Sequence, residues 1–450
     1  MKLVDRTDVK RGKTFESKKH PHYAIAFLLL FAVGMFFVFQ HIHPYWVIVT
    51  ANLVLMYISV LFLLIYFFEN DEVRVIDDTF PSISVIIPCY NAGDTIGKCV
   101  EHVLNSNYPK PMEIIIVDDG SNDADTKKAL KHLEKKVKVI YKPSNAGKAA
   151  ALNTGIKECK GELVACLDSD SYVEKDALIN MVKTMLKDEK NCAVTAFIKV
   201  HKPNSILTWI QEIEYYCAFG FNMLSYARLN SVFVTPGPMT LFRKKVFDEI
   251  GGFDENNPTE DLEICWRIRK YGYKISYSKD AIVYTEVPTK IKPLLKQRER
   301  WYRGKLFNIR LHRDMMFNPK YSLFGMFVLP TSLFAEVCAL SLISSLVYTF
   351  GSTLFRNLQT IIGLINTGLS HKIIGYIITG TGPTAALAMT MVLLIPFGFV
   401  CMASYSMGIK KLRWNHITLI PVFLFLYGVF ISFAYFISLV KELYGSAYRW

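Results

Sequence analysis

Long apolar segments lie towards both ends of the chain, and a mixed, charged stretch from about residue 70 to 320 separates them. Near the start, residues 23–39 and 46–68 are almost free of charge, and a helix of about 20 such residues crosses the hydrocarbon core of a bilayer. Because the second segment follows the first after a short loop, we predict an uncleaved helical hairpin rather than a cleaved signal peptide. Later spans are predicted at 323–350, 385–406 and 417–439, with a weaker, interfacial or re-entrant piece at 361–378.

Lysine and arginine residues set the predicted orientation of these spans, because basic residues collect on the cytoplasmic side. Seven of them lie in the first 20 residues, and the loop at 41–44 has none. We therefore expect the N-terminus and the 70–320 region in the cytoplasm, at the plasma membrane. A basic cluster at 410–413 also stays inside if the chain has five spans, which leaves the C-terminus outside.

Between the apolar ends, short apolar runs alternate with helical segments, which is typical of a parallel sheet covered on both faces. The predicted fold class is α/β, with a Rossmann-like, mostly parallel sheet, joined to an α-helical transmembrane bundle. Strands are predicted at 83–88, 114–117, 137–141 and 163–167, and helices at 94–105, 122–134 and 148–159. The predicted divisions are an N-terminal tail with two spans, a globular domain, an interfacial segment and a C-terminal membrane region, at residues 1–69, 70–288, 289–320 and 321–450.

The composition narrows the class of partner. Hydrophobic residues make up 51% of the chain, and the formal net charge is +13. Much of the positive charge flanks the predicted spans, where it meets anionic headgroups, so we expect membrane lipids rather than nucleic acid as partners. The nine cysteines are scattered without a C-x-x-C pair, which fits a reducing cytoplasm without disulfides or a zinc cluster.

Two carboxylates, Asp168 and Asp170, directly follow the predicted strand at 163–167. Ligands of open α/β sheets bind beyond the carboxyl ends of the strands. Side chains two residues apart in an extended stretch point to the same side, and two hard oxygen ligands suit a divalent cation that also takes water and phosphate oxygens. A solvated, Asp-rich turn is the alternative, because turns favour aspartate as well.

Other polar residues follow the neighbouring strands at the same predicted edge. Tyr90 and Asn91 follow the first strand. Asp118 and Asp119 follow the second. A nucleotide fits this edge, because a ring can stack on a base and carboxylates can accept hydrogen bonds from a base or a ribose hydroxyl. The chain has neither a G-x-G-x-x-G nor a P-loop motif, which argues against those two kinds of nucleotide site. Lys148, near a helix start, could contact a diphosphate or be a solvated lysine.

The second half of the globular region contains a Pro/Gly loop at 234–239 and a predicted helix at 262–271. The loop precedes a basic run and could be an ordinary turn. Thr259, Glu260 and Asp261 open the helix, where Thr259 could be the N-cap and Asp261 a first-turn acid.

A third segment, Q-R-E-R-W, follows at 297–301. In a helix, Gln297 and Arg300 share one face, Arg300 can bind a diphosphate with its planar fork, and Trp301 offers a flat apolar platform for a sugar ring. The alternative is a basic anchor at the membrane interface.

The order of these motifs resembles a known family. The motifs are S-V-I-I-P-C-Y-N at 84–91, V-D-D-G-S at 117–121, N-A-G-K at 145–148, D-S-D at 168–170 and Q-R-E-R-W at 297–301. Together they resemble a family 2 inverting glycosyltransferase of GT-A fold. The Q-x-x-R-W pattern resembles the processive members, which include cellulose, chitin, hyaluronan and poly-N-acetylglucosamine synthases. The Pro-Gly-Pro sequence at 236–238 departs from the Gly-Ser ending of the loop in relatives.

The resemblance implies a UDP-sugar donor, Mg²⁺ or Mn²⁺ as cofactor, and a saccharide or lipid-linked acceptor. Asp261, with Glu260 beside it, would be the general base that takes the proton of the acceptor hydroxyl. Asp168 and Asp170 would hold the metal. The residues that would bind the donor nucleotide are Pro88, Tyr90, Asn91, Asp118, Asp119, Lys148, Asp168, Gln297 and Arg300. Those that would hold the acceptor are Gly237, Pro238 and Trp301.

The predicted function is therefore the inverting transfer of an N-acetylhexosamine or a hexose to a growing polysaccharide, which leaves through the chain's own transmembrane channel. One alternative is a single transfer onto a polyprenyl phosphate or a glycolipid, against which the Q-x-x-R-W motif argues. A second is a membrane-bound sugar-nucleotide sensor or export subunit, against which the full set of acids argues. The predicted function requires Asp261 to lie near Asp168 and Asp170 in space.

Overall fold

Every residue of strand β1 (Ile83–Cys89) is buried, and its alternate side chains enter two separate cores. Ile83, Val85 and Ile87 belong to the core on one face of the sheet, and Ile86 belongs to the core on the other. Successive side chains of a strand point to opposite faces, so a strand covered on both sides must be apolar throughout. The computed structural model describes residues 21–42, parts of 46–65, 80–372 and 414–446.

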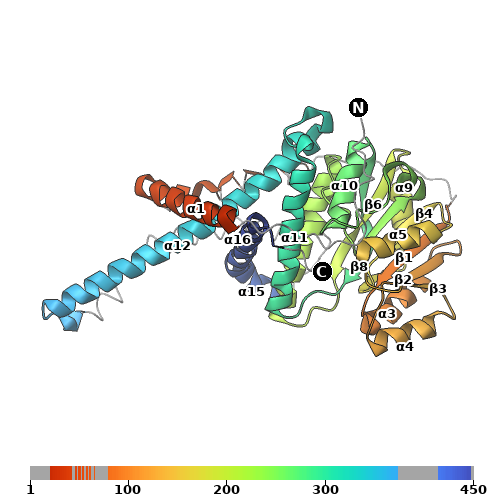
Figure 1. Cartoon of the computed structure of the whole chain (residues 1–450), viewed down its shortest axis with the longest axis horizontal. Coiled ribbons are helices and arrows are strands. Elements are labelled where there is room, and N and C mark those ends of the chain that lie inside the picture. Colours follow the sequence, from red (N-terminus) through yellow and green to blue (C-terminus); the bar gives the residue numbers. More distant parts are fainter. Residues whose placement is uncertain are drawn as a thin grey trace.

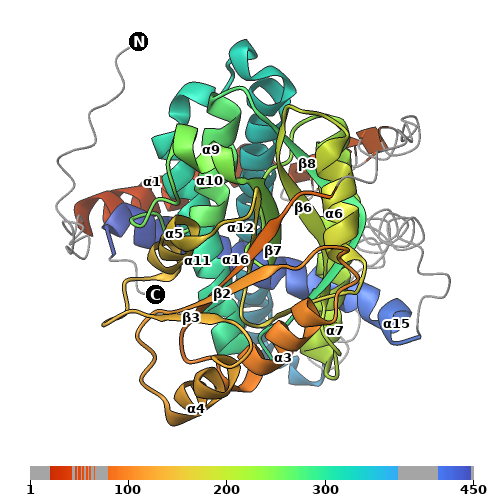
Figure 2. The same cartoon turned by 90° about the vertical axis from the view of Figure 1, so that its right-hand side faces the viewer.

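One eight-stranded sheet carries both cores, in the order β3-β2-β1-β4-β7-β6-β8-β5. Figure 2 labels some of these strands, from β3 and β2 through β7 to β6 and β8. The other strands are β2 (Glu113–Asp118), β3 (Lys138–Tyr141), β4 (Leu163–Leu167), β5 (Ser171–Val173), β6 (Asn191–Val200), β7 (Met239–Arg243) and β8 (Lys274–Thr285). The four predicted strands, β1 to β4, are present and parallel. Beyond them, β7 runs antiparallel to both of its neighbours, and β5 runs antiparallel to β8. The sheet is therefore mixed, and the prediction of a mostly parallel sheet holds for its first half.

Helices cover both faces of the sheet. The core that contains Val85 includes residues of α3 (Gly93–Leu104), α4 (Ala124–Leu133) and α6 (Ala177–Leu186). The core that contains Ile86 includes residues of α5 (Lys148–Glu158), α8 (Met223–Arg228), α9 (Lys244–Ile250) and α10 (Glu260–Lys270). The helices predicted before residue 160 are all present.

Helix α3 begins at Gly93, one residue before the predicted start. Ala92 occupies the N-cap position without a side-chain hydrogen bond, and Asp94 lies inside the first turn. There, a carboxylate interacts favourably with the positive end of the helix dipole. Helix α4 has the conventional cap, because the carboxylate of Asp123 accepts a hydrogen bond from the backbone N–H of Thr126 at 2.7 Å.

Helix α11 (Ile291–Leu311) lies between the sheet domain and the C-terminal helices, and it packs against both α10 and α16 (Figure 1). A further pair, α7 (Ile206–Tyr215) and the π-helix η1 (Tyr216–Asn222), packs on β6. The C-terminal helical elements are η2 (Arg313–Met315), η3 (Pro319–Tyr321), η4 (Phe324–Val328), α12 (Leu329–Asn366), η5 (Ser370–Lys372), α15 (Trp414–Val422), η6 (Phe423–Tyr427) and α16 (Gly428–Tyr444).

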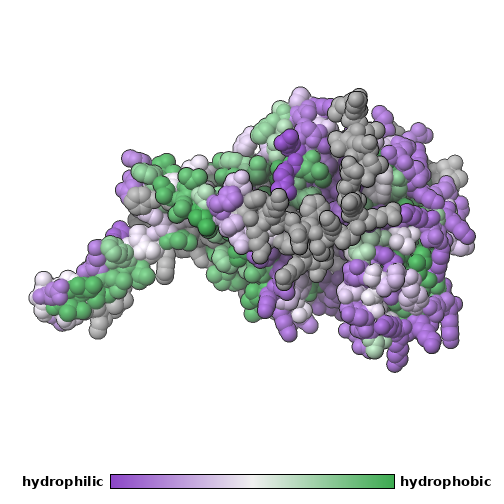
Figure 3. Space-filling model, in the orientation of Figure 1, coloured by the Kyte–Doolittle hydropathy of each residue, from purple (hydrophilic) through white to green (hydrophobic). Residues whose placement is uncertain are grey.

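Helices α1 (Pro21–His41) and α12 project from the sheet domain (Figure 1), and Figure 3 shows a mainly hydrophobic surface along them. Among the described residues, α1 alone is both long and apolar enough to cross a membrane. The segments predicted as spans at 323–350 and 417–439 are helical, and the piece at 361–378 is the end of α12 and a short 3₁₀ turn as far as it is described. The predicted span at 385–406, the basic cluster at 410–413 and much of 46–68 lie outside the described residues. A bundle of five spans therefore stays a prediction.

Helix α5 approaches β1 very closely, and Gly155 makes this approach possible. A Cβ atom built on Gly155 would lie 2.4 Å from Cγ2 of Ile86. Ile86 is fully buried, and its Cγ2 branches directly from Cβ, so it has no flexible end that could move aside. The position of α5 on the sheet therefore depends on the absence of a side chain at residue 155.

We expect Gly155→Ala to lower the free energy of unfolding by about 1–3 kcal/mol, the usual cost of an overpacked core. The matched control is Gly97→Ala in α3, where a Cβ would meet nothing within 4 Å and alanine favours the helix. Thermal unfolding of the purified full-length proteins would compare the two. Equal midpoints for both variants would contradict the packing argument.

Candidate active site

A cavity beyond the carboxyl end of β4 gathers residues from four segments of the chain. They come from α5, from the loop after β4, from the Pro/Gly loop before β7, and from the first turn of α10. The structure thus brings together five of the predicted site residues. The complete lining is Lys148, Leu152, Cys166, Asp168, Thr235, Pro236, Gly237, Thr240, Phe242, Phe253, Glu260 and Asp261.

Lys148 forms the electrostatic centre of this cavity. Its Nζ atom lies 2.5 Å from Oδ1 of Asp168 and 3.4 Å from Oε1 of Glu260. Burial alone would lower the pKa of Lys148, but the charges of Asp168, Glu260 and Asp261 outweigh it and hold that pKa above its ordinary value. Lys148 is therefore a permanent cation inside the site, and the alternative of a solvated surface lysine is wrong.

Asp261 is the second key group, and it is half-buried at the start of α10. Its Oδ1 accepts a hydrogen bond from the N–H of Leu262 at 2.8 Å, and its backbone carbonyl accepts one from the hydroxyl of Thr235 at 2.6 Å. Burial and the neighbouring Glu260 raise the pKa of Asp261 to about 6, although Lys148 and Arg300 act in the opposite direction. A carboxylate with a pKa near neutrality suits proton abstraction.

Thr259 occupies the N-cap position of α10, as predicted, but it does not cap the helix with its side chain. Its hydroxyl instead accepts a hydrogen bond from the side-chain amide of Asn308 in α11 at 3.0 Å. A Cβ atom built on Gly304 would lie 2.3 Å from the side chain of Thr259. Helix α11 therefore packs closely against the residue that precedes Glu260. Helix α11 therefore supports the end of α10 that carries the two acids.

Asp168 and Asp170 lie together after β4, with both side chains half-buried. Burial and the charge of Asp168 raise the pKa of Asp170 to about 6, partly offset by Lys148. The backbone N–H of Glu286 donates to the carbonyl of Asp170 at 3.2 Å, which ties this loop to the end of β8. In the part of the chain that the structure describes, no basic side chain pairs with Asp170, and no group of three or more His, Cys, Asp or Glu residues could hold a metal.

Asp119 holds the loop that leads into α5. Its carboxylate is 3% exposed and accepts hydrogen bonds from the backbone N–H groups of Ala146 at 3.1 Å and of Gly147 at 2.7 Å, and it pairs with Lys142. Gly147 has a φ of 95° and is the N-cap of α5, a conformation that glycine adopts readily. Asp119 therefore fixes the helix start that carries Lys148, whether or not it also contacts a nucleotide.

The other residues predicted to bind the nucleotide lie beside it at the same edge. Asp118 is buried, and its Oδ1 accepts from the N–H of Ser121 at 3.1 Å. Oδ1 of Asn91 accepts from the N–H of Asn122 at 3.1 Å. Both side chains thus hold loops of the edge, Pro88 is buried in β1, and Tyr90 is 46% exposed and accessible to a ligand. Direct contact of these residues with a donor stays a prediction.

The Q-R-E-R-W segment lies on α11, as predicted. Arg300 is exposed, and its charge lowers the pKa of Asp261, so the guanidinium lies within electrostatic reach of the acid. Oε1 of Gln297 accepts a hydrogen bond from Arg298 at 2.8 Å, and the guanidinium of Arg298 lies 4.1 Å from the ring centroid of Trp301. Gln297, Arg300, Trp301 and Pro238 do not line the cavity itself.

Sequence reasoning missed several groups that shape the cavity. Thr235 binds the carbonyl of Asp261, and its only signal was its place in the Pro/Gly loop. The side chain of Asn153 donates to the carbonyl of Phe253 at 2.9 Å and accepts from its N–H at 2.8 Å, which fastens the segment before α10 to α5. These contacts join residues far apart in the chain, so spacing alone could not indicate them.

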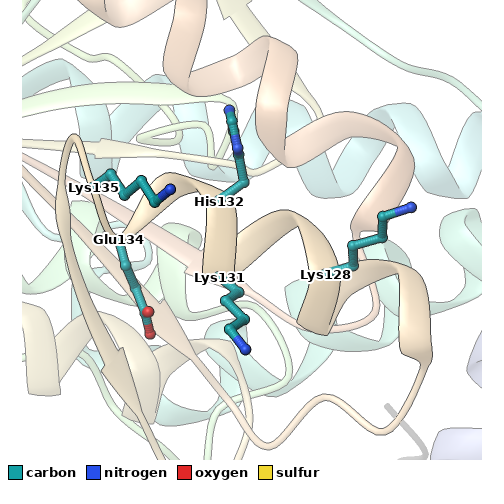
Figure 4. A pocket seen from close by; sticks show the side chains of 5 residues that line it. All are labelled: Lys128, Lys131, His132, Glu134 and Lys135. Atoms are coloured by element: carbon teal, nitrogen blue, oxygen red, sulfur yellow. The ribbon is translucent and has the colours of Figure 1, made fainter.

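A second hollow, on α4, is not a competing site. Its lining residues are Lys128, Lys131, His132, Glu134 and Lys135. Figure 4 shows that these side chains point in different directions instead of converging on a common point. A binding site needs a few polar groups aimed at one ligand, and the cavity around Lys148 has such groups, whereas the hollow on α4 does not.

Comparison with known proteins identifies the kind of domain to which most of this cavity belongs. The model of glycosyl transferase family 2 matches residues 84–251. A poly-beta-1,6-N-acetyl-D-glucosamine synthase of Staphylococcus aureus is 34% identical over 275 residues, which are 59% of this chain and 66% of the relative. The enzyme of the same name from Staphylococcus epidermidis is 36% identical over 224 residues, 49% of this chain and 54% of the relative. The matches thus span between half and two thirds of these relatives.

A solved structure shares the fold. The mannosyltransferase of Pyrobaculum calidifontis, in complex with GDP-Man and Mn²⁺, aligns with a TM-score of 0.56 over 87% of this chain and 99% of its own, at 19% sequence identity. At this identity the likeness concerns the fold alone, which is a GT-A-like mixed sheet covered by helices. Residues 84–251 of the chain therefore form a glycosyl transferase family 2 domain.

Proposed function

We propose that this chain is a membrane-bound, inverting glycosyltransferase that extends a polysaccharide with sugars from a UDP-sugar donor, with N-acetylglucosamine as the first candidate sugar. The observation that carries the proposal is the convergence of Asp261 with Lys148 and Asp168, which belong to the family 2 domain, on one cavity. The choice of sugar is supported by the similarity to two poly-beta-1,6-N-acetyl-D-glucosamine synthases.

In the proposed reaction, the carboxylate of Asp261 takes the proton of an acceptor hydroxyl. The oxygen then attacks the anomeric carbon of the donor, a new glycosidic bond forms, and the bond to the diphosphate oxygen breaks so that UDP leaves with the electron pair. One base suffices, because the leaving diphosphate needs no proton if cations offset its charge. Lys148, which is a permanent cation in the cavity, and Arg300 would supply part of that charge.

Asp168 and Asp170 fit a divalent cation such as Mg²⁺ or Mn²⁺. Both are hard oxygen donors, and within residues 80–372 Asp170 is a half-buried carboxylate without a basic partner. With only two protein ligands, the cation would keep water and diphosphate oxygens as its other ligands. Bound there, it would neutralise charge on the diphosphate.

The polymer-forming part of the proposal rests on α11. Trp301 would hold the acceptor saccharide, together with Gly237 and Pro238, and Gln297 and Arg300 would contact the donor diphosphate. The apolar helices at both ends of the chain would anchor the enzyme in the plasma membrane, with the sheet domain in the cytoplasm and a channel between the spans. A single transfer onto a polyprenyl phosphate or a glycolipid is the alternative.

The decisive experiment supplies the purified, full-length protein with a panel of UDP-sugars, with and without Mn²⁺ or Mg²⁺, and measures the release of UDP. Gel analysis of the labelled product then gives its length. A ladder of long products from UDP-N-acetylglucosamine supports the proposal, and a product extended by one sugar supports the alternative. The absence of UDP release from every donor would refute both.

We expect Asp261→Asn to lower kcat by about 10²–10⁴-fold, the usual contribution of a positioned general base. Donor affinity should change little, because the amide keeps the shape of the carboxylate. The matched control is Asp314→Asn, which removes a carboxylate that pairs with Lys270 outside the cavity and should leave kcat unchanged. Full turnover in the Asp261→Asn protein would refute the assignment of the base.

The same assignment predicts the pH dependence. Asp261 can accept a proton only when it is ionised, and its pKa lies at about 6. We therefore expect kcat/KM to be constant above that pH and to fall about tenfold per pH unit below it. A rate profile that rises as the pH falls through 6 would contradict a base at this position.

Gly237 offers a test of the cavity itself. A Cβ there would lie 2.3 Å from Nζ of Lys148 and 2.8 Å from Oδ2 of Asp168. Because Nζ ends a flexible side chain, Gly237→Ala should cost little stability but displace Lys148 from Asp168. We expect a loss of about tenfold or more in kcat/KM with an unchanged unfolding midpoint. Unchanged kinetics would mean that the loop and Lys148 do not act together.

A further inference from the structure

Arg298 is an unexpected feature of the Q-R-E-R-W segment, whose Q-x-x-R-W pattern leaves this position open. Its side chain is 1% exposed, the most buried charge of α11. The Nη1 atom donates to Oε1 of Gln297 at 2.8 Å, and the guanidinium lies 4.1 Å from the ring centroid of Trp301. One buried cation thus contacts two residues of the motif from the inside.

Two residues from other parts of the fold hold this cation. Nη2 of Arg298 donates to the carboxylate of Glu214 in α7 and to the hydroxyl of Tyr427 in η6 at 3.2 Å. The hydroxyl of Tyr427 in turn donates to the same carboxylate oxygen of Glu214 at 2.8 Å. The three polar groups therefore form a closed cluster that joins the sheet domain, α11 and the C-terminal helices.

The cluster determines what Gln297 and Trp301 can offer to a ligand. With its oxygen bound to Arg298, the amide of Gln297 is fixed in one orientation and keeps its NH₂ group free to donate elsewhere. Because the guanidinium covers one face of the Trp301 ring, only the other face can stack on a sugar. A guanidinium this deeply buried needs its carboxylate partner, so the arrangement depends on Glu214 and, through it, on Tyr427.

Attachment of α11 to the C-terminal helices does not require this cluster. Further along α11, Arg303 pairs with Glu442 at 3.4 Å, and Glu299 pairs with Lys441 of α16 at 2.7 Å. Those pairs fasten the two helices to each other. Among the ion pairs of α11 that the structure describes, the one between Arg298 and Glu214 involves the residue that contacts both Gln297 and Trp301.

We propose that Glu214, Arg298 and Tyr427 are positioning residues that hold Gln297 and Trp301 for the saccharide acceptor, so that the C-terminal segment η6 sets acceptor binding. This inference rests on the proposed function, because it takes Trp301 as the acceptor platform. It goes beyond it by assigning a role to three residues outside the motif pattern and by naming the contact through which the C-terminal helices reach the site.

The test compares Tyr427→Phe with Tyr284→Phe in the full-length protein. Both changes remove a tyrosine hydroxyl that donates to a glutamate at 2.8 Å, but Tyr284 and its partner Glu174 lie in the sheet domain, away from α11. The acceptor probe is a soluble oligosaccharide of β-1,6-linked N-acetylglucosamine, and the donor is UDP-N-acetylglucosamine. Hydrogen–deuterium exchange of residues 291–311 provides a readout that is independent of activity.

For Tyr427→Phe we expect the KM for the oligosaccharide to rise about three- to tenfold, as the loss of a buried hydrogen bond predicts. The KM for the donor should stay within about twofold. Exchange should rise in α11 around residues 297–301, and Tyr284→Phe should change none of these quantities. Arg298→Lys keeps the charge but loses the planar fork and its contact with the ring, so it should reproduce the change in acceptor KM.

Three outcomes would decide the matter. If Tyr427→Phe and Tyr284→Phe give the same KM values and the same exchange, the positioning role is wrong. If Tyr427→Phe raises the KM for the donor as much as the KM for the acceptor and also lowers the unfolding midpoint, the cluster only stabilises the fold. The inference is then wrong as well. If the wild-type protein releases no UDP from any UDP-sugar but α11 of Tyr427→Phe still exchanges faster, the proposed function fails while the positioning of α11 by Tyr427 stands.

Discussion

The candidate site depends on a single ammonium group placed among carboxylates. Asp168, Glu260 and Asp261 line one small cavity, and like charges that are close together and partly shielded from water repel strongly. Lys148 relieves this repulsion by pairing with Asp168 of the β4 loop and with Glu260 of α10. The lysine belongs to α5, so one cation ties together three elements that the chain forms far apart.

The position of that cation is set by packing at both ends of α5. At its start, the carboxylate of Asp119 binds the N–H of Gly147 at 2.7 Å, which fixes the residue directly before Lys148. Further along, Gly155 lets the helix lie against Ile86 of β1, and the small, fully buried Ala151 lies one turn before it on the same face. A bulkier helix would stand further from the sheet, and its first residue could not reach Asp168. The position of Lys148 in the site therefore depends on how α5 packs on the core of the sheet.

The sequence allowed much of this to be predicted, and the limits follow from the range of the interactions. Buried strands are apolar runs, so the bounds of β1 to β4 were predicted to within about two residues. The position of Asp168 directly after β4 was predicted as well. The convergence of Asp168 and Asp261 was implied only by the resemblance to a family. The antiparallel direction of β7 in the sheet and the hydrogen bond between Asn308 and Thr259 were not predicted, because both depend on tertiary contacts. The burial of Arg298 requires Glu214 and Tyr427, which are 84 and 129 residues away, and no local pattern encodes such a partner.

Helix α11 shows that the predicted division at residues 288 and 320 separates parts that act on one another. On one side, Asn308 binds Thr259, and Gly304 leaves just enough room for it. On the other side, Arg303 pairs with Glu442 of α16. Thr259 directly precedes Glu260 and Asp261, so a shift of α16 relative to the sheet must either break these buried contacts or move the end of α10. Breaking these contacts would leave buried polar groups unpaired, which costs more free energy than moving α10 together with α11 and α16. The acids of the site are thereby coupled to the C-terminal helices.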